Sequence, residues 1–148
     1  MGCINRNNTK QVISTIKGIA RETLQLIIEC SKSTYPNEFA GLLRAKDDVI
    51  IEVILVPGTE NSSHSAIIRM HMLPNMQIVG SVHSHPSVNI NPSSADLNMF
   101  SRTGNVHIII GSPYNEKSWV CYDAKGSQKE LDVVDCELAN DELDDFFL

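Results

Sequence analysis

Two histidines one residue apart are the first side chains in the sequence whose type and spacing suit metal chemistry. His83 and His85 end an apolar segment, and residues i and i+2 of a strand point to the same side. Asp96 falls in the first turn of an expected helix and can turn back toward both imidazoles. Zinc accepts imidazole nitrogen and carboxylate oxygen, and three protein ligands leave one tetrahedral position open for water, as in catalytic zinc sites.

Two more residues are candidates for chemistry around such a metal. An activated water needs a base to take its proton, and Glu38, between the first expected helix and an apolar strand, is the candidate. Ser93 is the candidate donor to the oxyanion that forms when water attacks a carbonyl. Structural alternatives remain open: paired histidines can simply pack, Glu38 can be a surface or capping carboxylate, and Ser93 can be a helix N-cap unless Ser94 supplies the cap.

Hydrophobic periodicity predicts the elements that must position these side chains. Residues 12–19 alternate like a strand, and a buried helical face then predicts a helix of about four turns that ends before Pro36. The apolar run at residues 49–56 fits a strand buried on both faces, at the centre of a sheet. The helical face comprises Ala20, Leu24, Ile27 and Ile28, and the other expected strands are residues 39–43, 66–70, 77–83 and 106–110.

The second half of the chain adds one helix and a hairpin. A helix capped by Ser93 or Ser94 should turn Leu97 and Phe100 inward. Residues 119–122 and 131–134, with turn residues between them, predict a late hairpin. Strands with one long helix early and one in the middle indicate an α/β or α+β layered sandwich.

Chain length indicates the number of domains, and net charge limits the classes of molecule that the protein is expected to bind. The chain has 148 residues, 42% of them hydrophobic, which predicts one globular domain at residues 11–136 between a mobile segment at 1–10 and an acidic tail at 137–148. The tail should be solvated, although its terminal Phe-Phe-Leu could dock in a groove of this chain or of a partner. A net charge of -6 argues against nucleic acid or an anionic membrane as partner and favours a protein or a neutral substrate.

The cysteines and the apolar segments indicate a cytoplasmic protein. The four cysteines show no CxxC pair, so reduced thiols are expected. No apolar run has the length of a membrane span, and the N-terminus lacks the apolar core of a signal peptide. The four are Cys3, Cys30, Cys121 and Cys136.

Taken together, the segments PNEFAGLL and HSHPSVNINPSSAD resemble the signature of the JAMM (MPN-plus) metalloprotease family: a glutamate after the first helix, His-x-His-Pro, then a serine and an aspartate. The resemblance covers about residues 13–134 and includes VHIIIGSPY and SWVCYDAKG, which are similar to later strands of the compact archaeal and bacterial members. It implies an α/β fold in which a curved mixed β-sheet is sandwiched between helices, with cytidine-deaminase-like layering. The six matching positions are Glu38, His83, His85, Pro86, Ser93 and Asp96.

The resemblance also implies roles. His83, His85 and Asp96 would hold one zinc ion per chain, which lowers the pKa of bound water to about 7. Glu38 would be the general base and acid, and Ser93 would steady the tetrahedral intermediate. No covalent enzyme intermediate is needed, so no cysteine need be a nucleophile.

Catalytic members of the family cut peptide or isopeptide bonds after the C-terminal glycines of ubiquitin or ubiquitin-like proteins. This chain has little room for the insertions of linkage-specific relatives, so it resembles the compact prokaryotic type, acting on a ubiquitin-like modifier, its conjugates or a sulfur-carrier protein. An edge strand at residues 65–71 is the candidate groove for an extended Gly-Gly tail.

Other functions stay open. Many MPN relatives are inactive scaffold or interaction subunits that have lost the metal, whereas all five functional positions are present here. Two histidines and a carboxylate also form the facial triad of non-haem iron oxygenases, which needs neither Glu38 nor Ser93. Nucleotide or DNA repair chemistry fits the acidic charge poorly. The sequence leaves open the modifier, the linkage, the choice between modifier removal, precursor trimming and sulfur transfer, and the oligomeric state.

Overall fold

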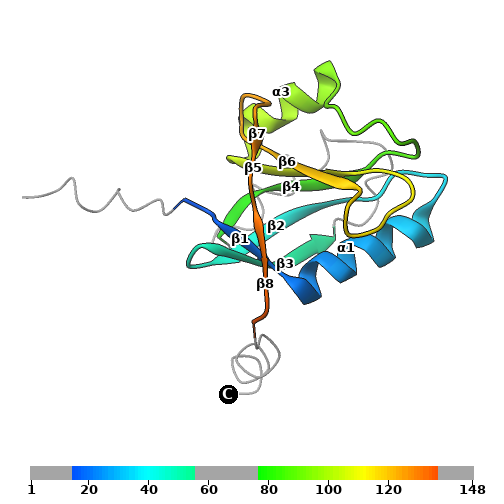
Figure 1. The fold of residues 1–148 in the computed structure, drawn as a ribbon. Coiled ribbons are helices and arrows are strands. Elements are labelled where there is room, and N and C mark those ends of the chain that lie inside the picture. The colour runs from blue at the N-terminus through cyan, green and yellow to red at the C-terminus, as the bar shows by residue number, and fades with distance from the viewer. Residues whose placement is uncertain (1–14, 56–76, 137–148) are drawn as a thin grey trace, which may run out of the picture.

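A computed structural model describes residues 15–55 and 77–136, which form one sheet and the helices that pack on it (Figure 1). The sheet has eight strands in the order β7-β6-β5-β4-β2-β3-β1-β8. The elements in chain order are β1 Gly18–Ala20, α1 Arg21–Thr34, β2 Ala40–Lys46, β3 Val49–Leu55, β4 Ile78–Ser84, α3 Ser94–Thr103, β5 Val106–Ile110, β6 Trp119–Tyr122, β7 Gln128–Lys129 and β8 Asp132–Val134.

The sheet is mixed and strongly curled. Strand β4 runs parallel to β5, and β1 runs parallel to β3 and β8, while the remaining pairs are antiparallel. Strands β7 and β8 lie at opposite ends of the sheet order, yet only Glu130 and Leu131 join them. The two outer strands must therefore approach each other, which requires the sheet to curl; Figure 1 shows the chain passing directly from β7 to β8.

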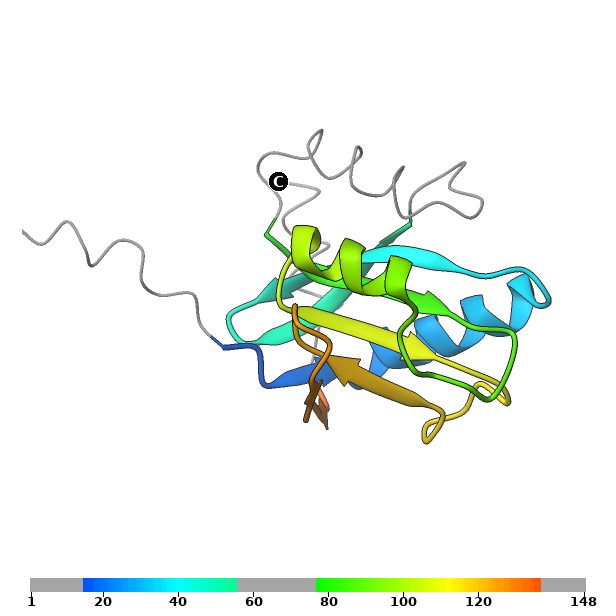
Figure 2. The ribbon, with the colours of Figure 1, turned by 90° about the horizontal axis from the view of Figure 1, so that it is seen from above.

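The two helices cover opposite faces of this sheet (Figures 1 and 2). Strand β5 shows the layering, because its side chains alternate between two apolar clusters. Ile108 and Ile110 pack in the core beneath α1, whereas Ile109 packs with Met99 and Phe100 of α3. The predicted fold class, a curved mixed sheet between helices, is confirmed.

Among the described strands of five or more residues, the one buried along its whole length is β5, and the prediction that residues 49–56 hold this central place is wrong. Every residue of β5 is buried, whereas in β3 only Ile50 and Val53 are, and Leu55 is 52% exposed. Strand β3 lies third from the β8 edge of the sheet. An apolar run reports hydrophobicity on both sides of a strand, but helix placement decides which sides are covered.

The first helix agrees with its prediction, and its flanking strand does not. Helix α1 buries Leu24, Ile27 and Ile28 as its periodicity indicated, but Ala20, which was predicted to belong to the same face, is the last residue of β1 and the N-cap of the helix. The strand expected at residues 12–19 begins only at Gly18 within the described part of the chain. Strand β1 has only three residues and lies between β3 and β8, near one end of the sheet.

Two predictions for the second half need correction. The hairpin partner of β6 is β7, and residues 132–134 instead form β8, which pairs with β1 at the far end of the sheet order. Leu97 is 37% exposed; Met99 and Phe100 make the inward face of α3. The short turn after β6 lets β6 and β7 close a hairpin by Lys129, so residues 132–134 are left to pair with β1 at the opposite edge of the sheet.

Several predictions concern segments outside the described residues. They are the mobile segment at residues 1–10, the strand at 66–70, the groove at 65–71 and the acidic tail at 137–148. The domain boundaries therefore stay predictions. Among the described residues, no helix is both long enough and apolar enough to cross a membrane.

Candidate metal centre

The two histidines lie where β4 ends, on the face of the sheet that α3 covers. The parallel register pairs His83 with Ile109, and Ile109 packs against α3, so the His83 side chain points to the same face. His85 follows two residues later on the same side and is half-buried, whereas His83 is only 7% exposed. Period-two alternation thus brings both imidazoles together, as the sequence predicted.

Helix α3 contributes Asp96 through its own N-terminus. Ser93 is the N-cap, and its Oγ accepts a hydrogen bond from the Asp96 backbone N–H at 3.1 Å. In return the Asp96 Oδ2 accepts from the Ser93 backbone N–H at 2.8 Å, which completes a capping box. This reciprocal pair fixes the Asp96 carboxylate beside the end of β4, and it is Ser93 rather than Ser94 that caps the helix.

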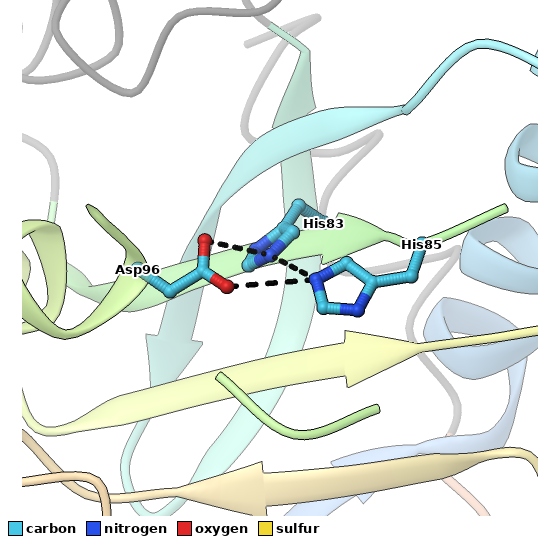
Figure 3. A group of neighbouring side chains, drawn as sticks. All are labelled: His83, His85 and Asp96. Atoms are coloured by element: carbon cyan, nitrogen blue, oxygen red, sulfur yellow. Dashed lines mark hydrogen bonds and ion pairs between the residues drawn. The ribbon is translucent and has the colours of Figure 1, made fainter. Parts of the chain in front are cut away.

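The three predicted ligands form a compact triangle of donor atoms (Figure 3). The Nε2 atoms of His83 and His85 are 3.1 Å apart, Asp96 Oδ1 is 3.2 Å from the first, and Asp96 Oδ2 is 3.5 Å from the second. In a tetrahedral site with bonds of about 2.0 to 2.1 Å, neighbouring donors lie about 3.3 Å apart. The donor set therefore fits a zinc ion in both chemistry and spacing.

The tautomer of His85 supports the same conclusion. Its Nδ1 is 2.7 Å from the backbone carbonyl oxygen of Asn89, which can only accept, so Nδ1 carries the hydrogen. In the neutral ring Nε2 is then left with a lone pair directed at His83 and Asp96, and such electron-rich atoms repel one another unless a cation lies among them. For His83 the orientation is less constrained, since its buried Nδ1 finds no hydrogen-bond partner in the described residues.

Electrostatics favour an ionised Asp96 carboxylate in this site at neutral pH. Burial raises the pKa of Asp96, but hydrogen bonds with His83 and His85 and from the Ser93 N–H outweigh burial, so the pKa lies well below its ordinary value. The hydrogen bond with Asp96 raises the pKa of His85 above 6.5, against an opposing effect of burial. An ionised carboxylate among imidazoles is the charge arrangement that a divalent cation requires.

Glu38 is brought to the same corner by strand pairing. The β2–β4 register pairs Ala40 with His83, and the ladder continues as the Ser84 backbone N–H donates to the Phe39 carbonyl at 2.9 Å. Continuing the register by one more residue places Glu38 opposite His85, on the face that carries Ala40 and His83. Glu38 is exposed, and its charge contributes to raising the pKa of His85. The three predicted ligands and Ser93 therefore lie together at one end of β4, and Glu38 is near enough for its charge to act on His85.

Three residues at this corner were not found by sequence reasoning. Asn89 acts through its backbone carbonyl, which no side-chain pattern reports. Tyr114 donates from its hydroxyl to the His85 carbonyl at 3.0 Å across a long stretch of chain. Ser84, between the histidines, accepts from the Phe39 backbone N–H at 2.8 Å. Only Ser84 had a local signal, because alternation turns it into the core and a fully buried serine needs a partner.

Comparison with known proteins gives consistent matches. Residues 20–122 match the family described as prokaryotic homologues of the JAB domain. A curated Haloferax volcanii protein described as a probable metalloprotease is 41% identical over 138 residues, covering 86% of this chain and 85% of that protein.

Two solved structures are similar in sequence and in fold. A JAB1/MPN domain protein from Archaeoglobus fulgidus has a TM-score of 0.67 at 41% identity and covers 80% of this chain and 99% of its own. A structure described as a JAMM metalloprotease-like zinc site in the proteasome and signalosome has a TM-score of 0.67 at 40% identity, covering 82% of this chain and all of the other.

Proposed function

The chain belongs to the JAMM/MPN family, in the group of prokaryotic JAB-domain homologues, and from this premise we propose that it is a zinc-dependent metalloprotease. Its substrate would be the amide bond after the C-terminal Gly-Gly of a ubiquitin-like modifier, of its conjugates or of a sulfur-carrier protein. The observation that carries the proposal is the cluster of His83, His85 and Asp96, in which the two Nε2 atoms and the two carboxylate oxygens make contacts of 3.1 to 3.5 Å.

His83, His85 and Asp96 would hold the ion. A bound zinc supplies Lewis acidity, which polarises a carbonyl and lowers the pKa of water. The protein's part is to hold the donors in place before the metal arrives. The Asn89 carbonyl fixes the ring of His85, and the capping box fixes the carboxylate of Asp96.

Glu38 would move the proton. As the general base it would accept a proton from the attacking water and then donate it to the leaving amine, a role in which a positioned carboxylate contributes about 10² to 10⁴ in rate. Its exposed side chain leaves it open to water and substrate. Its position opposite His85 on the ligand face supports this role.

Ser93 would stabilise the oxyanion, and its capping role is compatible with this. In the capping box the Ser93 Oγ uses a lone pair to accept the Asp96 N–H, so its hydroxyl hydrogen is still free to donate. A donor aimed at the developing oxyanion is worth a factor of about 100 or more. One side chain can thus cap the helix, orient the ligand-bearing turn and donate to substrate.

A glycine tail suits this corner. Without a Cβ, a Gly-Gly backbone can approach a metal and its ligands more closely than other residues can. An extended tail added beside a strand would use main-chain hydrogen bonds for affinity. We propose a cytoplasmic ubiquitin-like protein or its conjugates as the partner.

The test is metal content and cleavage measured on one preparation, for wild type beside Glu38→Gln. The probe is a ubiquitin-like protein ending in Gly-Gly and joined to the Nε of a lysine in a labelled peptide. We expect about one zinc per chain in both proteins, cleavage by wild type, and a loss of about 10²-fold or more in Glu38→Gln.

A matched control is Glu22→Gln, which removes an exposed carboxylate from the first turn of α1, at the end of the helix away from Glu38. It should retain wild-type cleavage. Zinc-loaded wild type that fails to cut the probe would contradict the proposed substrate class, and absence of zinc from wild type would favour the scaffold alternative.

A further inference from the structure

The residue between the two histidines has a contact that the proposed chemistry does not yet use. We propose that Ser84 is a positioning residue that holds Glu38 beside the metal ligands through paired hydrogen bonds to Phe39. The inference rests on the proposed function, since it concerns how the proposed proton carrier is held. Its evidence is the pairing between the end of β4 and the segment that enters β2.

The pairing departs from a regular ladder at this point. In a hydrogen-bonded antiparallel pair, the two residues exchange both backbone N–H to carbonyl bonds. Here the Ser84 N–H donates to the Phe39 carbonyl at 2.9 Å, but the Phe39 N–H donates to the Ser84 hydroxyl at 2.8 Å. The serine side chain has replaced its own backbone carbonyl as acceptor. A residue without a side-chain acceptor would leave the Phe39 N–H unpaired.

The two residues are anchored on the face opposite the metal centre. Phe39 is 6% exposed and belongs to the core beneath α1, and Ser84 is fully buried. Alternation then directs the preceding Glu38, like the neighbouring His83 and His85, to the other face. One Ser84–Phe39 pair therefore links the strand end that carries two ligands to the segment that carries the proposed base.

Removing the hydroxyl should loosen this link without removing a ligand. A buried N–H left without an acceptor is unfavourable, so the chain would shift to find a new partner for the Phe39 N–H. The adjacent Glu38 would move with it, while the ligand side chains keep their own supports from Asn89 and Ser93. A displacement of about 1 Å in a positioned group can cost on the order of 10²-fold in rate.

The chain offers a matched control in Ser81, which is also buried on β4. Its hydroxyl bonds the Nδ1 of His107 at 2.8 Å, and among the described residues it forms no hydrogen bond with the Glu38 segment. Ser81→Ala and Ser84→Ala each remove one buried hydroxyl from the same strand. Only the second should act on Glu38.

The first measurement does not depend on activity. With Co²⁺ bound in place of zinc, pseudocontact shifts of backbone amides report their position relative to the metal. We expect the shifts of the Glu38 and Phe39 amides to change in Ser84→Ala and to stay at wild-type values in Ser81→Ala. Unchanged shifts in Ser84→Ala would overturn the inference. If Ser84→Ala does not fold, Ser84→Cys takes its place, because a thiol is a weak acceptor.

The second measurement is a double-mutant cycle on the isopeptide probe. Ser84→Ala should lower kcat by about 10-fold to 100-fold and leave KM and zinc affinity within about twofold. In a Glu38→Gln background the same substitution should lower kcat by less than about twofold, because the group it positions is already gone. Ser81→Ala should change kcat by less than about twofold in both backgrounds.

The outcomes separate the two proposals. Equal losses from Ser84→Ala with and without the Glu38 carboxylate would overturn the positioning role while leaving the proposed function standing. Wild type and Glu38→Gln cleaving equally would overturn the proposed function of Glu38, and the Co²⁺ shifts would still decide whether Ser84 holds the segment.

Discussion

His107 on β5 and the pair His83 and His85 at the end of β4 lie on the same face of the sheet, but their surroundings differ. His107 on β5 has a partner for each ring nitrogen. Its Nε2 is 2.9 Å from the Gly104 carbonyl oxygen, which can only accept, so Nε2 carries the hydrogen and donates it. Its Nδ1 then accepts from the Ser81 hydroxyl at 2.8 Å. The ring also stacks on Phe100, with centroids 4.2 Å apart and planes 7° from parallel.

At the end of β4 the pattern reverses. The Nε2 atoms of His83 and His85 point at each other and at the Asp96 carboxylate, and no neutral arrangement of hydrogens supplies donors for all of these acceptors. His107 is satisfied by the protein itself, whereas the atoms of the His83–His85–Asp96 cluster need an added proton or a metal ion among them. Burial alone therefore does not identify a functional histidine. The groups that its ring nitrogens face, and whether those groups donate or accept, are the better guide.

The sharpest test of this difference is zinc affinity. Asp96→Asn keeps the side-chain shape and an oxygen for the capping box but removes the charge, so we expect zinc affinity to fall on the order of a thousand-fold, beyond the loss of an outer-sphere partner. His107→Gln should keep about one zinc per chain at near wild-type affinity. Competition titration with a chelating dye measures both. Equal loss of zinc from the two variants would erase the distinction between the histidine of β5 and the pair of β4.

A second test uses pH, because the histidine of β5 and the pair of β4 also differ in charge. Burial lowers the pKa of His107 from 6.5 to about 4. Hydrogen bonds with the backbone of Gly104 and Phe100 oppose this shift, charge on His83 adds to it, and Asp123 raises the pKa. Between pH 6.5 and 4 the unfolded chain binds a proton at this position and the folded chain does not. The free energy of unfolding should therefore fall as pH falls through this range, by up to about 3 kcal/mol.

Urea unfolding in EDTA at several pH values, for wild type and His107→Gln, isolates this contribution. The other titrating groups are common to both proteins, so the difference between their free energies of unfolding reports His107. Stability from the neutral ring is complete above about pH 6.5, and wild type should lose its share relative to the variant toward pH 4. A difference that stays constant with pH would show that His107 titrates in the folded state as it does in the unfolded chain.

The comparison also shows which parts of the site the sequence could predict. His83 and His85 were predictable because strand alternation is a two-residue rule, and Asp96 because the turn that begins at Ser93 closes over three residues. The place of Glu38 is a different matter. Its place near His85 depends on the β2–β4 pairing, which at this end joins Phe39 to Ser84, 45 residues away, and has no local signal.

The fold shows the same limit. Periodicity predicted α1, whose buried face follows a local repeat, but misplaced the most buried strand, because helix α3 rather than the sequence of β5 decides that its second face is covered. The β7–β8 crossing was missed for a similar reason. The sequence predicted residues 131–134 as the hairpin partner of 119–122, because the two-residue strand β7 carries no pattern of its own and only the curl of the sheet sends β8 to the opposite edge.

The smallest expected effect comes from the outer support of His85. Tyr114 is buried, and its hydroxyl donates to the His85 backbone carbonyl at 3.0 Å. Tyr114→Phe keeps the ring and removes only this bond, which should cost about 1 kcal/mol of unfolding free energy. Because His85 keeps its Asn89 contact, zinc affinity should fall by no more than about tenfold, the lower end of the range for outer partners.

Thr103→Val is the control for this last test, since Thr103 is buried and its hydroxyl bonds the Met99 carbonyl at 2.9 Å, within α3 and away from any ligand backbone. It should lose a similar amount of stability and no zinc affinity. Urea unfolding in EDTA gives the first quantity and chelator competition the second. If both variants lost zinc affinity alike, the loss would follow from lower stability of the fold in general. Loss in Tyr114→Phe alone would show that the hydrogen bond to the His85 carbonyl helps to hold this ligand in place for the metal.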